Sequence, residues 1–249
     1  MTILTPGPRV TGALLVISAA VANGAFTGLS SFFDYPQVLQ APADRVLEQF
    51  TEQAVQVGAL FTLLAMGAAL LLPIALGTAA LAGPGRWTRA AALTGVAAAL
   101  VQAVGLARWP LLVPSLAATA TDRTASPAER STAIERFELA NSVLGQIVGE
   151  AGGFLLTAAW TVLVLAALSQ RHILPRWSTA LALVSAPMIL AGLLVPLGVP
   201  GADAVNFIGY ILWSGWIVAL GVTLLRGGLT TRSAATAASA PTRHAVVAA

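Results

Sequence analysis

The sequence predicts an all-α membrane protein, a bundle of six transmembrane helices with both termini in the cytoplasm. Of its 249 residues 57% are hydrophobic and 9% are charged, and the mean hydropathy is +0.83, whereas soluble domains carry about 25% charged residues. Six apolar segments are long enough to cross a hydrocarbon core about 30 Å thick, which takes roughly 20 helical residues. Arginines and acidic residues also lie in alternate loops, and this alternation orients the bundle.

The six spans form one continuous region followed by a polar tail. The spans are predicted near residues 10–33, 54–82, 90–114, 139–168, 179–199 and 205–225. We expect residues 1–226 to form a single transmembrane domain. Residues 227–249 consist mostly of small and polar residues without a periodic apolar face, which predicts a disordered cytoplasmic tail.

The charge distribution predicts the orientation. Of the 13 basic residues, all of them arginine, the majority lie at one set of helix ends: Arg9, Arg86, Arg89, Arg171, Arg176, Arg226, Arg232 and Arg243. The 10 acidic residues lie in the opposite loops, or inside the membrane near them. Short loops rich in arginine stay cytoplasmic, because the insertion machinery and the membrane potential disfavour moving them across the bilayer. The pattern therefore places both termini in the cytoplasm.

The first span allows a second interpretation. Arg9, the apolar run that follows it and the Ala20-Val21-Ala22 triplet resemble a secretory signal peptide with its cleavage site. Cleavage would leave five spans. The apolar character continues as far as Phe33, however, which is longer than the apolar region of a typical signal peptide. This length favours an uncleaved helix.

Two loops on the acidic side are long enough to hold helices. Ser126 and Glu129 have the spacing of a capping box with Pro127 at the first helical position, so a helix is expected to begin there and run into the fourth span. In the first loop, Val46, Leu47, Phe50 and Ala54 share one face, which predicts a short amphipathic helix on the membrane interface. Either helix could be a lid over the bundle or a plain connector.

Arg108 and Glu150 are ionisable residues inside the predicted spans. Counted from Ala90 and from Leu168, both lie at a depth of roughly 27 Å at 1.5 Å per residue. They are on consecutive antiparallel helices, so we predict an ion pair between them. The alternative is that Arg108 extends to the interface while Glu150 is protonated in an apolar pocket.

The fourth span carries a polar face. Glu138, Ser142, Gln146 and Glu150 follow one another at intervals of four residues, so they share one side of a helix. We predict a polar cavity formed by Glu138, Ser142 and Gln146 together with Gln102 and Trp109 of the third span.

A second face of the same helix consists of small residues. Gly145, Gly149 and Gly153 repeat at intervals of four, a pattern that allows another helix to approach closely. We therefore predict that they are helix-packing positions. Prolines are expected to break or kink three of the spans, at Pro73, Pro110, Pro114, Pro187 and Pro196.

Several kinds of chemistry have no basis in this sequence. It contains no cysteine, which excludes disulfides and thiolate metal sites. Its two histidines, His172 and His244, lie in a loop and in the tail, so neither a histidine zinc site nor paired haem ligands are available. Motifs of metalloproteases, nucleotide-binding loops and serine hydrolases are absent. We expect no metal, no cofactor and no catalytic residue.

Short motifs resemble a known family. Ile173-Leu174-Pro175-Arg176-Trp177, the small-residue-rich span after it, Gln56 to Leu60 and Asn206 to Trp216 are similar to segments of the DUF4386 family, which consists of uncharacterised bacterial multi-pass integral membrane proteins. The resemblance covers most of residues 10–226. It implies a six-span fold in the bacterial plasma membrane, and it brings no activity and no site residues.

Two functional classes fit these observations. The first is a non-catalytic transporter or ligand-sensing protein for a small molecule, in which Glu150 couples to protons and Arg108 is its counter-charge. The second is an assembly partner that docks another membrane protein, or a second copy, through its glycine face. A lipid-acting enzyme is a third class. The net charge of +3 comes from arginines beside apolar spans, so the expected partner is lipid and not nucleic acid.

Overall fold

The computed structural model describes residues 5–169 and 175–227, and all regular structure within these residues is helical. Six helical segments are long and apolar enough to cross a membrane, so the predicted fold class is confirmed. The cytoplasmic location of the termini remains a prediction. The tail after Gly227 and both histidines lie outside the described residues.

Each predicted span corresponds to one helix or to consecutive helices. The first is α1 (Pro8–Phe33) and the last is α10 (Ala202–Leu225). The second is α3 (Ala54–Ala69) with α4 (Leu71–Ala82), and the third is α5 (Arg86–Leu111) with α6 (Val113–Thr121). The fourth comprises α7 (Pro127–Ala140), η2 (Asn141–Gly152) and α8 (Gly153–Leu168), and the fifth is α9 (Arg176–Leu190) with η4 (Ala191–Leu197). Between the first two spans lie η1 (Gln37–Gln40) and α2 (Ala43–Glu52).

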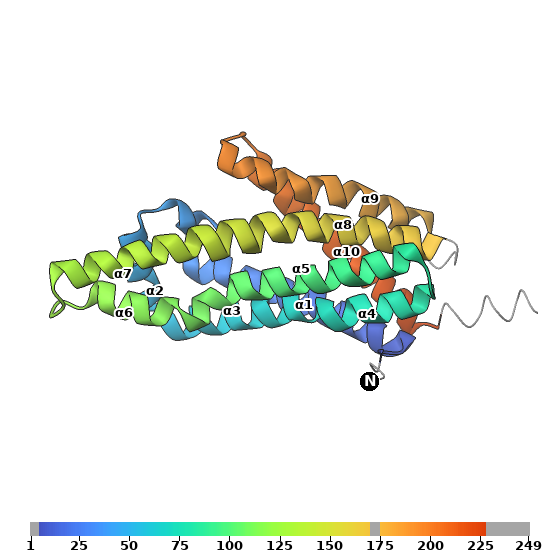
Figure 1. The fold of residues 1–249 in the computed structure, drawn as a ribbon, viewed down its shortest axis with the longest axis horizontal. Helices are drawn as coiled ribbons and strands as arrows, with labels where there is room; N and C mark the ends of the chain where they lie inside the picture. The colour runs from blue at the N-terminus through green and yellow to red at the C-terminus, as the bar shows by residue number, and fades with distance from the viewer. Residues whose placement is uncertain (1–4, 170–174, 228–249) are drawn as a thin grey trace, which may run out of the picture.

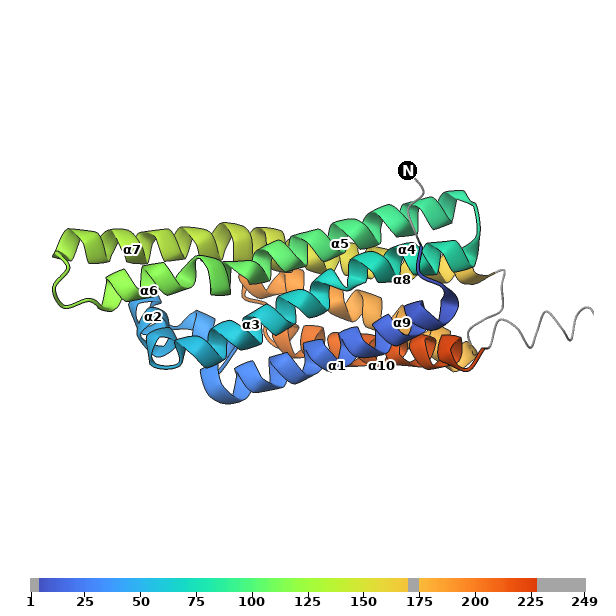
Figure 2. The ribbon, with the colours of Figure 1, turned by 90° about the horizontal axis from the view of Figure 1, so that it is seen from below.

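The bundle has two different ends (Figures 1 and 2). At the terminal end lie the start of α1, the α4–α5 turn and the end of α10. At the hairpin end, α6 and α7 form a hairpin that projects past the other helices, with α2 beside it. The third and fourth segments have 36 and 42 residues, which correspond to roughly 54 and 63 Å and exceed the bilayer core. The hairpin therefore extends out of the hydrocarbon region.

Three of the spans change geometry at prolines. The second breaks at Leu70, three residues before Pro73, and the third breaks at Leu112, between Pro110 and Pro114. The fifth passes from α to 3₁₀ geometry after Pro187. Proline has no N–H to donate and its ring clashes with the preceding turn, so these positions favour a break.

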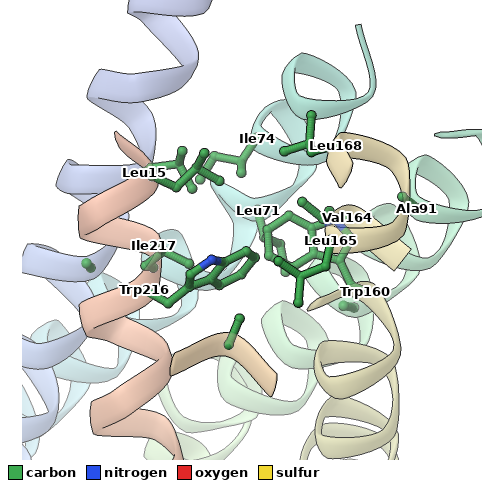
Figure 3. Close-up of a cluster of buried hydrophobic side chains, with 14 of the residues drawn as sticks. Leu15, Leu71, Ile74, Ala91, Trp160, Val164, Leu165, Leu168, Trp216 and Ile217 are labelled. Carbon is green, nitrogen blue, oxygen red and sulfur yellow. The ribbon is translucent and has the colours of Figure 1, made fainter. Parts of the chain in front are cut away.

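Two apolar clusters fill the bundle. The cluster near the terminal end includes Leu15, Trp160, Val164 and Trp216. Figure 3 shows these side chains meeting between the helices, and the rings of Trp160 and Trp216 lie 5.9 Å apart. The cluster near the hairpin end is rich in aromatic residues, and its members include Phe33, Phe50, Phe61, Trp109 and Phe137.

The two predicted loop helices are present. The side chain of Ser126 accepts a hydrogen bond from the Glu129 amide, and the carboxylate of Glu129 accepts one from the Ser126 amide, which completes the predicted capping box. Helix α2 buries Val46, Leu47 and Phe50, as its sequence predicts. This face packs against α6, α7 and the aromatic cluster, so it is covered by protein and does not insert into lipid, and the location of α2 on the membrane interface remains a prediction. Phe50 instead contacts the protein's own Phe33 and Trp109.

Candidate functional site

The middle of the fourth span is wound as a π-helix. Residues Asn141–Gly152 form this segment, between the α-helical geometry of α7 and that of α8. A π-helix is rare, and π-helical segments within α-helices are frequent at functional sites. The sequence offered no direct signal for it, because the apolar and polar spacing of this region is compatible with an ordinary α-helix. The π-helix marks η2 as the first place to look for a site.

Helix α5 lies unusually close to η2, because glycines face each other. A Cβ atom added to Gly105 would lie 2.6 Å from the Cα of Gly149, and one added to Gly145 would lie 2.7 Å from the Arg108 guanidinium. A Cβ on Gly153 would meet the Gln102 side chain at 2.9 Å. The three predicted helix-packing glycines thus all face α5 of the same chain. The surface that a docking partner would use is already occupied.

Arg108 is buried at this contact, with 4% of its surface exposed. Its guanidinium donates hydrogen bonds to the carbonyl oxygen of Gly105 and, at 2.8 Å, to Oδ1 of Asn141. It also lies 5.4 Å from the ring centroid of Trp109. Among the described residues, its Nε has no hydrogen-bond partner. A buried cation with a spare donor needs charge compensation nearby.

Glu150 is half-buried on η2 and interacts electrostatically with Arg108. The guanidinium lies over Asn141 and Gly145, however, and Glu150 follows further along the helix toward α8. Within the described residues, the hydrogen bonds of Arg108 go to Gly105 and Asn141 and none goes to this carboxylate. The charges attract each other through space, and a direct ion pair remains a proposal.

A pocket of about 240 Å³ lies at the hairpin end, between η2 and the η1–α2 segment. Its polar wall comes from α7 and η2, and its apolar wall comes from η1, α2 and the residues that join them. The lining residues are Glu138, Asn141, Ser142 and Gln146 with Phe137 on one side, and Leu39, Ala41, Pro42, Ala43 and Val46 on the other. The structure therefore brings together three of the residues predicted to form a polar cavity, and all three are exposed.

The other two predicted cavity residues lie elsewhere. Trp109 is fully buried and stacks on Phe61 with ring centroids 4.5 Å apart. Gln102 packs against Gly153 and donates a hydrogen bond to Thr157 at 3.1 Å. The two side chains lie away from the pocket because α5 directs Trp109 toward the aromatic cluster and Gln102 toward α8. Neither residue lines the pocket.

Two residues of the site were not singled out from the sequence. Asn141 lines the pocket and also accepts the hydrogen bond from Arg108. A buried arginine needs an acceptor on the facing helix, and Asn141 lies four residues before Gly145, so its position was in principle detectable. Tyr35 lies just beyond the first span, half-buried against Phe61. Burial and the nearby Glu150 charge raise the pKa of its phenol to about 12, which keeps the phenol neutral.

The arrangement is suited to binding rather than to covalent chemistry. Its side chains offer amide, hydroxyl and carboxylate groups, and these can hold a ligand by hydrogen bonds and charge. In residues 5–169 and 175–227, no three His, Cys, Asp or Glu side chains come close enough to hold a metal ion.

Comparison with known protein families identifies the chain at the level of family. A model described as "Domain of unknown function (DUF4386)" matches residues 10–221. The chain belongs to the DUF4386 family. No curated protein and no solved structure matches it. The family match confirms the family that the short motifs resemble. With six helical segments of spanning length among the described residues, this DUF4386 protein is a multi-pass membrane protein whose helices contact the lipid bilayer.

Proposed function

We propose that this DUF4386 protein is a non-catalytic transporter or ligand-sensing protein of the bacterial plasma membrane, and that it holds a small molecule in the pocket at the hairpin end. One observation carries the proposal. A pocket with a volume of about 240 Å³ lies between a polar wall, formed by α7 and η2, and an apolar wall, formed by η1 and α2. Small-molecule sites typically combine an apolar lining with a few polar groups that fix the ligand's orientation. With both termini in the cytoplasm, this pocket opens to the cell exterior.

The site also contains a route for charge. Glu138, Ser142 and Gln146 line the pocket, and Glu150 follows them on η2 toward the middle of the membrane. Ionisable residues inside membranes are costly, and they commonly mark ion pathways and proton relays. We propose that Glu150 takes up and releases protons during transport or signalling, and that Arg108 is its counter-charge.

The packing of the bundle favours this class over an assembly partner. Docking through the glycine face requires that Gly145, Gly149 and Gly153 be accessible. In the structure, these glycines meet Arg108, Gly105 and Gln102 of α5. An additional helix could reach them only if α5 moved away.

The proposal is tested by a ligand screen on the purified protein in lipid nanodiscs, with thermal shift as the measurement. The Ser142→Trp variant fills the pocket, and the Val143→Trp variant is its matched control, because Val143 is exposed but does not line the pocket. A compound bound in the pocket should stabilise the wild type and the Val143→Trp variant but not the Ser142→Trp variant. Compounds that stabilise all three proteins equally bind elsewhere, and a screen that yields only such compounds would refute the site.

The role of Glu150 is tested on any ligand found in this way. In proteoliposomes, Glu150→Gln should abolish the pH dependence of uptake or of binding, because the neutral amide cannot exchange a proton. Glu135→Gln is the comparison, since Glu135 is exposed on α7 and does not line the pocket. A pH profile that is unchanged in the Glu150→Gln variant would exclude proton coupling at this residue.

A further inference from the structure

Among the residues that the structure describes, Glu138 is the one charged side chain that lines the pocket. It is exposed, and in the described part of the chain no arginine forms an ion pair with it and no group donates a hydrogen bond to it. The two other acidic residues of the same helix do have local partners: Glu129 accepts hydrogen bonds from Ser126, and Glu135 accepts one from Ser131. The carboxylate of Glu138 is therefore free to receive a ligand.

The orientation of the Asn141 amide is fixed by its neighbour. Arg108 has only donors, so the group facing it must be the amide oxygen, and Oδ1 accepts its hydrogen bond at 2.8 Å. The Nδ2 group then retains both N–H donors, and Nδ2 makes no hydrogen bond within residues 5–169 and 175–227. The hydrogen bond from Arg108 thus fixes the Asn141 side chain so that its Nδ2 donors remain available. Because Asn141 lines the pocket, a ligand that bonds to Nδ2 must supply a hydrogen-bond acceptor.

The spacing of the two groups limits the ligand. Glu138 and Asn141 are three residues apart where α7 meets η2, so their Cβ atoms lie about 5 to 6 Å from each other. A single small molecule can reach both groups. The opposite wall, formed by Leu39, Pro42 and Val46, requires that the rest of the ligand be apolar.

The charge of the hairpin end agrees with a cationic ligand. Acidic residues outnumber basic ones there: Asp34, Asp44, Glu48, Glu52, Asp122, Glu129, Glu135 and Glu138 against Arg45, Arg123, Arg130 and Arg136. A surface with an excess of one sign raises the local concentration of oppositely charged small molecules and speeds their association.

We propose that the pocket takes a small organic ammonium compound with a hydrogen-bond acceptor, such as a carbonyl, a few bonds from the nitrogen. The ammonium group binds Glu138, the acceptor binds Nδ2 of Asn141, and the apolar part packs on Leu39, Pro42 and Val46. This inference rests on the proposed function, because it assigns the chemical class of ligand to the same pocket.

Three matched probes test the assignment by calorimetry on the nanodisc-embedded protein. L-Leucine methyl ester has both groups, isoamylamine lacks the carbonyl, and methyl isocaproate lacks the amine. We expect the ester of leucine to bind about tenfold more tightly than isoamylamine, since one further hydrogen bond is made. Methyl isocaproate should bind most weakly of the three.

Two substitutions separate the contacts. Glu138→Gln should weaken both amines by about tenfold or more, whereas Glu135→Gln, the control on the same helix, should leave them unchanged. Asn141→Asp keeps an acceptor for Arg108 and removes the Nδ2 donors. In this variant the preference for leucine methyl ester over isoamylamine should disappear, while amine binding itself is retained.

The outcomes distinguish this inference from the proposed function. If Glu138→Gln binds both amines as tightly as the wild type, the ammonium assignment is wrong. If the carboxylate probe isovalerate binds and Ser142→Trp blocks it while the amines do not bind, the pocket is real and its ligand is an anion. If no probe of either charge is blocked by Ser142→Trp, both the inference and the proposed site fail.

Discussion

The two halves of the bundle differ in the polar groups that they bury. Near the terminal end, the buried hydroxyls of Thr78, Thr161 and Ser185 bond to carbonyls of their own helices, and Trp213 donates to Thr161. Among the described residues, the buried polar atoms without a partner at that end are neutral: Oγ of Ser178 and Nε1 of Trp160 and Trp216. Near the hairpin end, the fourth span is a π-helix, and the atoms without a partner include Nε of Arg108, which belongs to a charged group. Burying a charge costs more than burying a neutral polar group, and proteins keep such costly features mainly at functional or strained sites.

The orientation of the bundle is the sharpest test of this comparison, because its result is all-or-none. The chain has no cysteine, so single cysteines can be introduced at Arg123 in the hairpin loop and at Pro84 in the α4–α5 turn, both of which are exposed. On intact cells, a membrane-impermeant maleimide should label the Arg123→Cys variant and not the Pro84→Cys variant. After permeabilisation both should react. The reverse pattern on intact cells would place the pocket in the cytoplasm.

Removing the buried cation should have the largest effect on stability. Arg108→Ala deletes the hydrogen bonds to Gly105 and Asn141 and leaves Glu150 without its proposed counter-charge. Removing one partner of a buried charge pair costs about 3 to 5 kcal/mol. The measurement is the free energy of unfolding in detergent, with Arg89→Ala as the control, since Arg89 is exposed at the terminal end.

The same experiment measures the coupling to Glu150. If the charges compensate each other, Glu150→Gln should cost less in the Arg108→Ala background than in the wild type. Because the hydrogen bonds of Arg108 go to Gly105 and Asn141, we expect a coupling of only about 1 kcal/mol. If the two effects are simply additive, Glu150 is not the counter-charge of Arg108.

The fold was largely predictable from the sequence, because a bilayer leaves a chain few options. Every backbone polar group must be satisfied within its own helix, so apolar length alone located the spans, and Ser126 with Glu129 located the start of α7. The length of the third span was underestimated: it was predicted to end at residue 114, and α6 continues it as helix to Thr121.

The site was predictable only in part, because it depends on geometry that periodicity cannot show. Glu138, Ser142 and Gln146 were found by their spacing and do meet at the pocket. The apolar wall from η1 and α2 depends on how a loop folds back, and the role of Asn141 depends on which face of a π-helix meets Arg108. Trp109 was assigned to the cavity because it adjoins Arg108 in sequence, yet consecutive helical residues point in different directions.

Because α5 and η2 are in close contact, a side chain added between them should lower the free energy of unfolding by about 1 to 3 kcal/mol, the usual cost of overpacking. Gly105→Ala places a Cβ 2.6 Å from the backbone of Gly149, so α5 and η2 must separate. Gly58→Ala is the control, because nothing lies within 4 Å of its added Cβ. Thermal melts in detergent compare the two variants. Equal melting temperatures would show that the α5–η2 contact is looser than the structure has it.

The smallest effect should come from the cap of α7. Ser126→Ala removes the acceptor of the Glu129 amide, and loss of such a cap costs about 1 kcal/mol. The terminal half should keep the bundle folded, so the change should appear as faster hydrogen exchange at the first amides of α7. Ser131→Ala, an exposed position within the same helix, is the control. Because Glu138 lies near the other end of α7, Ser126→Ala should hardly change the affinity for a pocket ligand. A large loss of affinity would mean that the hairpin and the pocket move as one unit.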